Sequence, residues 1–273
     1  MSDTIITLKN VTKIYEGKTI LQNVNLSVPE GQSLTLCGHN GSGKSTLLKL
    51  MAGLVKPTSG SVTVTKKPLF HYIPEHFPKT DLTVWQYLKA MGRIDGIDQD
   101  GTDQAAGQLL KDSFMEQMKD VPMKHLSKGS LQKVGVIQAL LKVPDIMLLD
   151  EPLSGQDRPS QMVFIEKMNH LREQKTTLIM SCHEPFLMHS LSDIIYQVQD
   201  GGLSLRENPG EFEESRYILV FEEKPDALLP SALGGKAGRQ NGRLTLLVSG
   251  QESNDVIGQM LQSGFTLREM YEQ

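Results

Sequence analysis

The segment Gly38 to Thr46, GHNGSGKST, has the residue types and spacing needed to bind a phosphate group. Its glycines let backbone N–H groups wrap around a β-phosphate, while Lys44 can neutralise β- and γ-phosphate oxygens and the Ser45 hydroxyl can ligate Mg²⁺. An apolar run before the segment and a helical pattern after it are the flanks that a phosphate loop requires, so an ordinary glycine turn is the weaker interpretation. The residues expected to form the loop are Gly38, Asn40, Gly41, Ser42, Gly43, Lys44, Ser45 and Thr46.

Two adjacent carboxylates follow another apolar run, in the segment Asp145 to Pro152, DIMLLDEP. A strand buried on both faces would deliver Asp150 at its carboxyl end, where open α/β sheets bind ligands. Asp150 could then hold Mg²⁺ through water, and Glu151 could polarise an attacking water molecule. Acidic residues are common at strand ends, but downstream of a phosphate loop this pair predicts a nucleotide-hydrolysing centre in which Lys44 is a further catalytic group.

A second polar, glycine-containing segment, Lys124 to Val134 (KHLSKGSLQKV), precedes an apolar helical pattern. Its Ser127 and Gly129 are typical of a helix start, and helix starts bind anions. The alternative is a simple capped helix. The phosphate loop already provides an anion site, so this segment raises the question of which phosphate it would bind.

Taken together and in this order, the three segments resemble the nucleotide-binding subunit of an ABC transporter. The resemblance covers about Ile5 to Asp200, and LSKGS (Leu126 to Ser130) is similar to the LSGGQ signature of that family. It implies ATP and Mg²⁺ as ligands and two ATPase domains paired head to tail. Ser127 and Gly129 of one copy would then bind the γ-phosphate of ATP held by the other copy.

Three more residues acquire roles from the resemblance. Tyr15, in KIYEGKTIL, stands where the family places an aromatic ring that stacks on adenine, although a strand tyrosine can also be packing alone. Asp157 ends SGQD, which resembles the D-loop that contacts the opposite subunit. His183, in LIMSCHEP, matches the switch histidine that hydrogen-bonds the γ-phosphate, and its alternative is a structural histidine at a strand end.

The sequence departs from the family pattern in three places. Glu75, in YIPEHF, takes the position of the usual Q-loop glutamine; its carboxylate can serve as a Mg²⁺ ligand but adds negative charge beside ATP and Glu151. In the signature, Lys128 replaces a glycine and Ser130 replaces a glutamine, and the lysine adds positive charge near the phosphate of the other copy. Gln156 replaces a small or apolar D-loop residue, with no clear consequence.

Hydrophobic patterns predict the elements that position these residues. From Ile5 to Val28, apolar alternations broken by turn residues predict antiparallel strands. Ser33 to Cys37 is a short apolar strand, and Lys44 to Leu54 has helical spacing. About Phe77 to Lys142 is predicted to be mostly helical, with the acidic, glycine-rich Asp95 to Gly107 as an exposed connection.

The second half of the chain predicts strands that alternate with helices, followed by a change of pattern. Apolar strands at Ile146 to Leu149 and Thr177 to Ser181 flank a helix at Gln161 to Glu173, which implies a parallel sheet covered on both faces. Beyond about Glu207, strands are predicted at Arg216 to Glu223 and Gly242 to Gly250, with a glycine-rich loop at Gly234 to Gly242 between them. A helix is predicted at Asn254 to Phe265.

The predicted fold class is therefore α/β. It comprises a P-loop NTPase core with a mostly parallel sheet, an N-terminal antiparallel β subdomain, a helical signature subdomain at about 77–142 and a small α+β C-terminal domain. The expected domain limits are 1–205 for the ATP-binding domain and 206–273 for an accessory or regulatory domain. The C-terminal domain could bind a regulator, steady a dimer or cover a sheet edge.

Composition excludes several classes of protein. The formal net charge is −4 over 273 residues and no Lys/Arg run occurs, so direct nucleic-acid binding is not expected. The two cysteines, Cys37 and Cys182, lack partners at metal-ligand spacing and are expected to be buried reduced thiols. No window reaches about eighteen apolar residues and no signal peptide is apparent. We therefore expect a cytoplasmic protein, peripheral on the inner face of the cell membrane.

The leading hypothesis is the energy-supplying subunit of an ABC transporter, acting as a homodimer or a paired ATPase with separate membrane-spanning permease subunits. LSKGSLQKV and the C-terminal region most resemble exporter-type systems. The alternative is a soluble ABC ATPase that remodels a cytosolic assembly, although such proteins usually carry two ATPase halves or a coiled-coil insertion. A GTPase switch is disfavoured because the guanine-reading N-K-x-D motif is absent.

Overall fold

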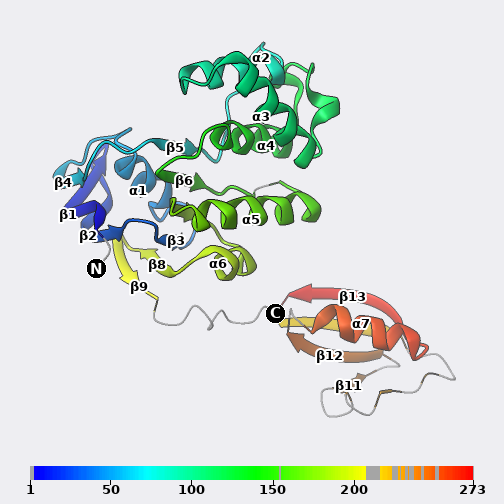
Figure 1. Ribbon diagram of the computed structural model, residues 1–273. Coiled ribbons are helices and arrows are strands. Elements are labelled where there is room, and N and C mark those ends of the chain that lie inside the picture. Colours follow the sequence, from blue (N-terminus) through cyan, green and yellow to red (C-terminus); the bar gives the residue numbers. More distant parts are fainter. Residues whose placement is uncertain are drawn as a thin grey trace. The chain divides into compact units, whose positions relative to one another are not determined.

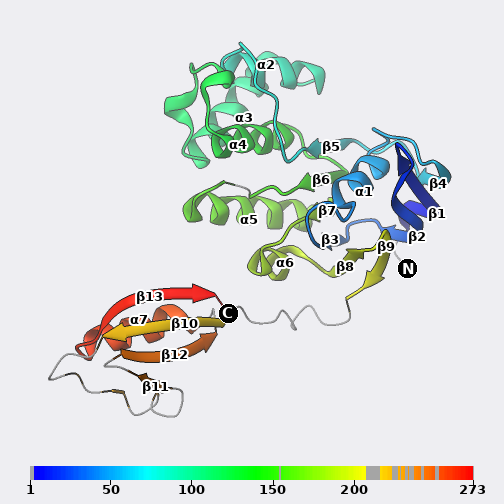
Figure 2. The same cartoon turned by 180° about the vertical axis from the view of Figure 1, so that it is seen from behind.

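The chain is divided into two compact units, Met1–Pro209 and Gly210–Gln273 (Figures 1 and 2). The structure is a computed structural model. It describes residues 3–153, 155–206, 216–222, 227, 229–230, 233, 237–240, 243–249 and 252–272.

A six-stranded sheet forms the centre of the first unit, in the order β5-β6-β7-β3-β8-β9. The first five of these strands run parallel and β9 is antiparallel to β8. Every residue of β3, β6 and β7 is buried, as expected for strands covered on both faces. The predicted parallel sheet is confirmed. The strands are β3 (Ser33–Cys37), β5 (Phe70–Ile73), β6 (Ile146–Asp150), β7 (Thr177–Ser181), β8 (Ile194–Gln199) and β9 (Gly202–Leu205).

Beside this sheet lies an antiparallel sheet of order β2-β1-β4, the predicted N-terminal β subdomain (Figure 1). Its strands are β1 (Thr4–Tyr15), β2 (Lys18–Pro29) and β4 (Ser59–Val64). Alternate residues near the end of β2 are buried, as the pleat requires when one face of a sheet packs on a core. These side chains share one apolar cluster with the buried face of helix α1 (Lys44–Met51), which also contacts β6 and β7. The phosphate-binding helix is therefore anchored between the two sheets.

The helical subdomain comprises α2 (Val84–Ile94), α3 (Gln99–Asp112), α4 (Lys128–Leu140) and two short 3-10 turns, η1 (Glu116–Met118) and η2 (Met123–His125). The prediction of an exposed connection from Asp95 to Gly107 is wrong, because α3 occupies most of it. Asp98 caps this helix by accepting a hydrogen bond from the Gly101 amide (2.7 Å). Thr102 and Ala106 are buried against its neighbours, so tertiary packing stabilises a segment whose composition favours a loop.

Two further helices complete the first unit, α5 (Arg158–Glu173) and α6 (Pro185–Leu191). The two helices pack against each other, and α5 begins three residues earlier than its predicted start at Gln161 because Asp157 caps it. Within the described residues, no helix combines the length and apolar character that crossing a lipid bilayer needs. Cys37 and Cys182 are buried and unpaired, as predicted.

The second unit contains a four-stranded antiparallel sheet of order β11-β12-β10-β13 and one helix. Its elements are β10 (Arg216–Glu222), β11 (Ala237–Gln240), β12 (Arg243–Ser249), α7 (Ser253–Gln262) and β13 (Thr266–Glu272). The unit has its own apolar core, in which Phe221 and Phe265 make an edge-to-face contact. The prediction of a loop from Gly234 to Gly242 is wrong for β11, while Gly234 and Gly242 themselves lie outside the described residues. The strand β13 was not predicted.

Candidate functional site

The phosphate loop lies between β3 and α1, where the sequence predicts it. Gly38 has φ +146°, and a Cβ atom there would stand 2.3 Å from the Val198 carbonyl oxygen, so only glycine fits. Gly43 has φ +107° and is the N-cap of α1. The buried Lys44 turns its ammonium group into the loop, where Nζ donates to the Gly38 and His39 carbonyl oxygens at 2.7 and 3.2 Å. The loop geometry is thus set by the close approach of Gly38 to the Val198 backbone and by the hydrogen bonds of Lys44.

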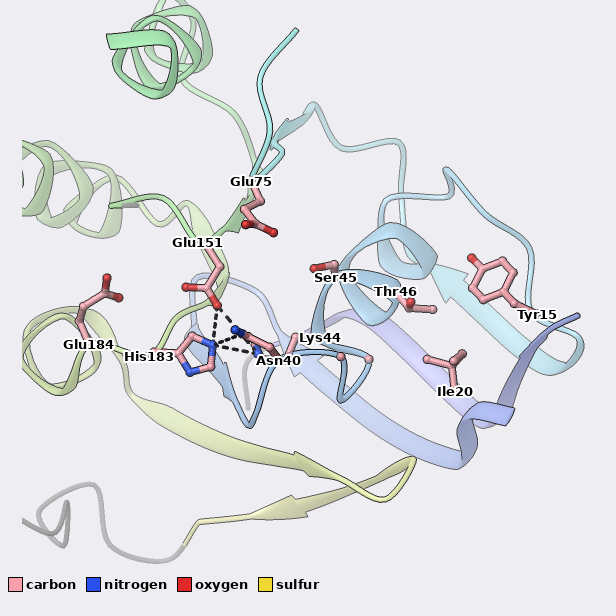
Figure 3. Close-up of a pocket in the computed structure, with 12 residues that line it drawn as sticks. Tyr15, Ile20, Asn40, Lys44, Ser45, Thr46, Glu75, Glu151, His183 and Glu184 are labelled. Atoms are coloured by element: carbon pink, nitrogen blue, oxygen red, sulfur yellow. Dashed lines mark hydrogen bonds and ion pairs between the residues drawn. The ribbon is translucent and has the colours of Figure 1, made fainter. Parts of the chain in front are cut away.

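This loop forms one wall of a pocket of about 570 Å³, within the size range of small-molecule sites (Figure 3). Ten of the predicted site residues line the pocket: Tyr15, Asn40, Gly41, Gly43, Lys44, Ser45, Thr46, Glu75, Glu151 and His183. Ile20 and Glu184 complete the lining and were not predicted. Gly38 and the buried Ser42 belong to the loop without lining the pocket.

Asp150 is held by three hydroxyl groups at the carboxyl end of β6. Its Oδ1 accepts from Ser45 (2.9 Å) and Ser181 (2.7 Å), and its Oδ2 accepts from Tyr72 (3.3 Å). Burial raises the pKa of the Tyr72 hydroxyl, and the neighbouring carboxylate of Asp150 raises it further, so this group stays a donor. Sequence analysis missed Tyr72 and Ser181, although each stands at the end of a strand adjacent to β6.

The chemistry of this group of oxygen atoms fits Mg²⁺. Ser45 and Asp150 supply hard oxygen ligands, and Glu75 lines the same pocket. In the part of the chain that the structure describes, no cluster of three or more His, Cys, Asp or Glu side chains could hold a metal ion. A cation that keeps several waters and shares substrate phosphates, as Mg²⁺ does, needs no such protein cage.

Glu151 begins the turn after β6 with φ +48°, a left-handed conformation that non-glycine residues rarely adopt. Its amide donates to the Ser181 carbonyl oxygen at 3.1 Å, which fixes the turn. The carboxylate Oε1 lies 3.0 Å from His183 Nε2 and 3.9 Å from Lys44 Nζ (Figure 3). Burial raises the pKa of Glu151 to about 7, with Lys44 opposing the rise. A carboxylate poised near neutral pH suits a proton acceptor.

His183 meets Glu151, Lys44 and Asn40 through one ring nitrogen. Its Nε2 lies 3.1 Å from Lys44 Nζ and 3.2 Å from Asn40 Oδ1. Burial and the positive charge of Lys44 lower the pKa of His183, which favours the neutral imidazole. His183, which follows β7, therefore contacts both the phosphate loop and Glu151, which follows β6.

We expect the ionisation of Glu151 to make the nucleotide-free protein less stable as pH rises. The folded-state pKa of about 7 exceeds the ordinary value of 4.5, so the folded chain holds the proton more tightly. The free energy of unfolding therefore falls between pH 4.5 and 7, by about 3 kcal/mol for a shift of this size. Glu151→Gln should raise the melting temperature more at about pH 8 than at about pH 5, measured in Mg²⁺-free buffer. Equal shifts at both pH values would contradict the raised pKa.

Tyr15 lies at the far end of the pocket from Glu151 (Figure 3). Its side chain is 41% exposed at the end of β1, and the Lys13 ammonium group stands 4.6 Å from the ring centroid. A ring this exposed is not a core packing residue, which favours the predicted stacking role over the alternative of packing alone.

The remaining predicted residues, Ser127, Gly129 and Asp157, do not line the pocket. Ser127 caps α4 by accepting from the Ser130 amide (3.1 Å), and Asp157 caps α5. A Cβ on Gly129 would stand 2.2 Å from the Gly155 carbonyl oxygen, so the signature and D-loop segments are in direct contact. Ser154, the first residue of SGQD, lies outside the described residues. The structure thus divides the predicted residues into a pocket group and a separate cluster.

Asp157 is fixed in its capping position by Ser160. Its Oδ1 accepts from the Ser160 amide (2.9 Å) and hydroxyl (2.6 Å), and these hydrogen bonds lower the pKa of the carboxyl group. Lys133 Nζ of α4 lies 3.7 Å from its other oxygen. The starts of α4 and α5 are therefore held together, with Ser127 and Asp157 exposed and Gly129 buried beside Gly155.

The fold and the pocket together define a P-loop nucleoside triphosphatase. The sequence profile described as "ABC transporter" matches residues 21–154. The zinc import ATP-binding protein ZnuC of Pseudomonas fluorescens is 34% identical over 197 residues, 71% of this chain and 73% of the relative. The chain belongs to the ABC transporter family.

Solved structures agree with this assignment. The ATP-binding subunit of an ABC transporter shares 25% identity at a TM-score of 0.69, covering 74% of this chain and 90% of that one. A post-hydrolysis dimer of an ATP-binding cassette bound to ADP and Pi has the same TM-score of 0.69 and 24% identity, covering 76% of this chain and 100% of that chain. The second likeness concerns the fold alone.

The protein is therefore an ATP-binding and ATP-hydrolysing subunit that uses Mg²⁺ and works with separate membrane subunits. Its predicted fold class is confirmed. The predicted resemblance to exporter-type systems finds no support in the named relatives, whose names refer to zinc import. Those names do not favour the alternative of a cytosolic remodelling ATPase either.

Proposed function

We propose that two copies of this chain form the ATPase engine of one transporter, each copy completing the nucleotide site of the other. The observation that carries the proposal is the division of the site. One group of residues lines a pocket that fits a nucleotide, while Ser127, Gly129 and Asp157 lie together outside it. A head-to-tail pair would bring this second cluster over the pocket of the partner copy.

Within each pocket, the residues take separate roles. Tyr15 stacks on adenine, the phosphate loop with Lys44 holds the β- and γ-phosphates, and Ser45 and Asp150 hold Mg²⁺, with Glu75 beside them. When bound, Mg²⁺ neutralises charge that develops on the transferred phosphoryl group. Glu151 accepts a proton from the attacking water.

Other groups stabilise the same charge from outside the phosphate loop. His183 donates a hydrogen bond to the γ-phosphate from the end of β7. Ser127 and the Gly129 amide of the partner copy approach it from the other side, where helix-start donors favour an anion. Asp157 contacts the opposite copy and keeps the two sites in register.

The protein acts at the membrane through a separate permease. The permease, not this chain, contacts the solute in such an arrangement. The relatives named zinc import ATP-binding proteins make zinc the first solute to test and uptake the first direction.

The test combines assembly and membrane association. A tagged Glu151→Gln variant should form a dimer in solution with ATP but not with ADP, measured by light scattering. The same variant should retain a polytopic membrane protein when purified from gently solubilised membranes. A protein that stays monomeric with ATP yet hydrolyses it at full rate would contradict the proposal.

A further inference from the structure

Two of the departures from the family pattern contact each other in the structure. Lys128, which replaces a signature glycine, places Nζ 3.8 Å from Oε1 of Glu75, which replaces the Q-loop glutamine. His76 Nδ1 lies 3.6 Å from the same oxygen. Lys128 and Glu75 are far apart in sequence and belong to different segments, so this pairing is visible only in three dimensions. A charge introduced on one segment meets the opposite charge on the other.

The position of Lys128 is unfavourable for its own helix. Lys128 is the first residue of α4, where the helix macrodipole places partial positive charge, and the first turn contains no acidic residue to offset it. Its side chain is about half exposed and Glu75 is 40% exposed. A lysine here weakens the helix terminus but strengthens the same terminus as a binding site for an anion. This favours a role in phosphate binding over a role in stability.

Glu75 connects this lysine to the nucleotide pocket. Glu75 lines the pocket, whereas Ser127 and Gly129, the residues on either side of Lys128, do not, and we expect the start of α4 to meet the partner copy. In the proposed pair, the ammonium group of Lys128 would have two possible anionic partners, the Glu75 carboxylate of its own chain and the γ-phosphate of ATP in the other. A γ-phosphate carries more negative charge than one carboxylate and attracts the ammonium more strongly.

We propose that Lys128 is a catalytic cation supplied in trans, which contacts the γ-phosphate of ATP bound to the partner copy and is held by Glu75 of its own chain until the dimer closes. This inference rests on the proposed head-to-tail assembly. An exposed ion pair contributes no more than about fivefold to an equilibrium constant, so closure can exchange one partner for the other at little cost. Release of Lys128 also leaves the Glu75 carboxylate free to face Mg²⁺ in its own pocket.

The experiment measures ATP-driven dimerisation of four variants in the Glu151→Gln background: the parent, Lys128→Met, Glu75→Gln, and both changes together. Methionine keeps the length of the lysine side chain and removes its charge. We expect Lys128→Met to weaken ATP-dependent association about tenfold or more, as loss of a charged phosphate contact does. Glu75→Gln should tighten it by up to about fivefold, because the lysine is no longer held back. That gain should disappear when Lys128 is already methionine.

Lys124→Met is the matched control. Lys124 lies four positions earlier, is 50% exposed and pairs with Asp81 at 2.7 Å, so its replacement also removes one positive charge from an exposed ion pair. It should leave dimerisation unchanged. Affinity of the monomer for ADP should be equal in Lys128→Met and its parent, which shows that the cis pocket is intact.

Three outcomes would overturn the inference. Lys128→Met could dimerise like Lys124→Met, which would remove the lysine from the γ-phosphate. The effects of Lys128→Met and Glu75→Gln could be additive, which would mean that the two residues act independently. A parent that fails to dimerise with ATP would contradict the head-to-tail function itself, and this inference with it.

Discussion

Glu151→Gln is expected to lower the rate of ATP turnover by about two to four orders of magnitude while leaving ATP binding intact. The carboxylate stands 3.0 Å from His183 and its pKa of about 7 suits a group that accepts a proton from water. Glutamine keeps the shape and the left-handed backbone position but cannot accept that proton. Turnover is measured as phosphate release with saturating Mg²⁺, and binding by fluorescence of a labelled ATP analogue.

Glu184→Gln is the matched control for this experiment. Glu184 also lines the pocket, but it stands beyond His183, on the side away from Lys44 and Ser45 (Figure 3). Its loss should change turnover by less than about tenfold. If Glu151→Gln hydrolyses ATP at the normal rate, Glu151 is not the general base.

Gly129→Ala is expected to abolish ATP-driven dimerisation and to reduce turnover about a hundredfold or more, with monomer ATP binding unchanged. A Cβ here would stand 2.2 Å from the Gly155 carbonyl oxygen, far inside van der Waals contact, and both groups belong to backbone that cannot yield cheaply. The added methyl group must move the starts of α4 and α5 apart, which displaces Ser127 and Asp157 together. An error of about 1 Å in such a constellation costs about a hundredfold.

The same substitution at Gly107 separates this effect from a general loss of stability. Gly107 lies within α3, and a Cβ there meets no atom within 4 Å. Gly107→Ala should leave turnover unchanged and raise the stability of the helix slightly, because alanine is the better helix former. Normal ATP-driven dimerisation of Gly129→Ala would contradict the role given to the signature segment.

The parts of the site that could be predicted from sequence are those fixed by short spacing along the chain. The loop from Gly38 to Thr46 needs glycines at set intervals between a strand and a helix, and Asp150 with Glu151 must follow a buried strand. The structure places Glu151 and most of the loop residues around one pocket, and Asp150 accepts a hydrogen bond from Ser45 in that lining. Both requirements concern residues that are adjacent or closely spaced along the chain, so a single sequence is enough to reveal them.

The helix α3 illustrates why other predictions failed. Its first half contains two aspartates, one glycine and few apolar residues, which locally favour a loop. What stabilises the helix is contact: a Cβ on Gly92 of α2 would stand 2.4 Å from the Thr102 side chain, so the two helices approach closely only because position 92 is glycine. Such a contact depends on tertiary packing, which overrides weak helix propensity.

Contacts between distant segments were also beyond the sequence. Tyr72 donates to Asp150 across neighbouring strands, and Lys128 pairs with Glu75 across two segments of the first unit. The sequence gives the identity of each residue, and Lys128 and Glu75 were noted as departures from the family pattern. Which residues they contact depends on strand order and helix placement. A single sequence without related sequences does not reveal either.

The closed apolar core of the second unit has a consequence for the history of the chain. The core around Phe221 and Phe265 is formed by residues of the second unit alone. We therefore expect this unit to fold without contributions from the side chains of the ATPase unit. Recombination near residue 209 could therefore attach, delete or replace this unit in one genetic step and leave the catalytic machinery in working order. Natural selection could in this way change the regulation of the ATPase domain without changing its catalytic residues.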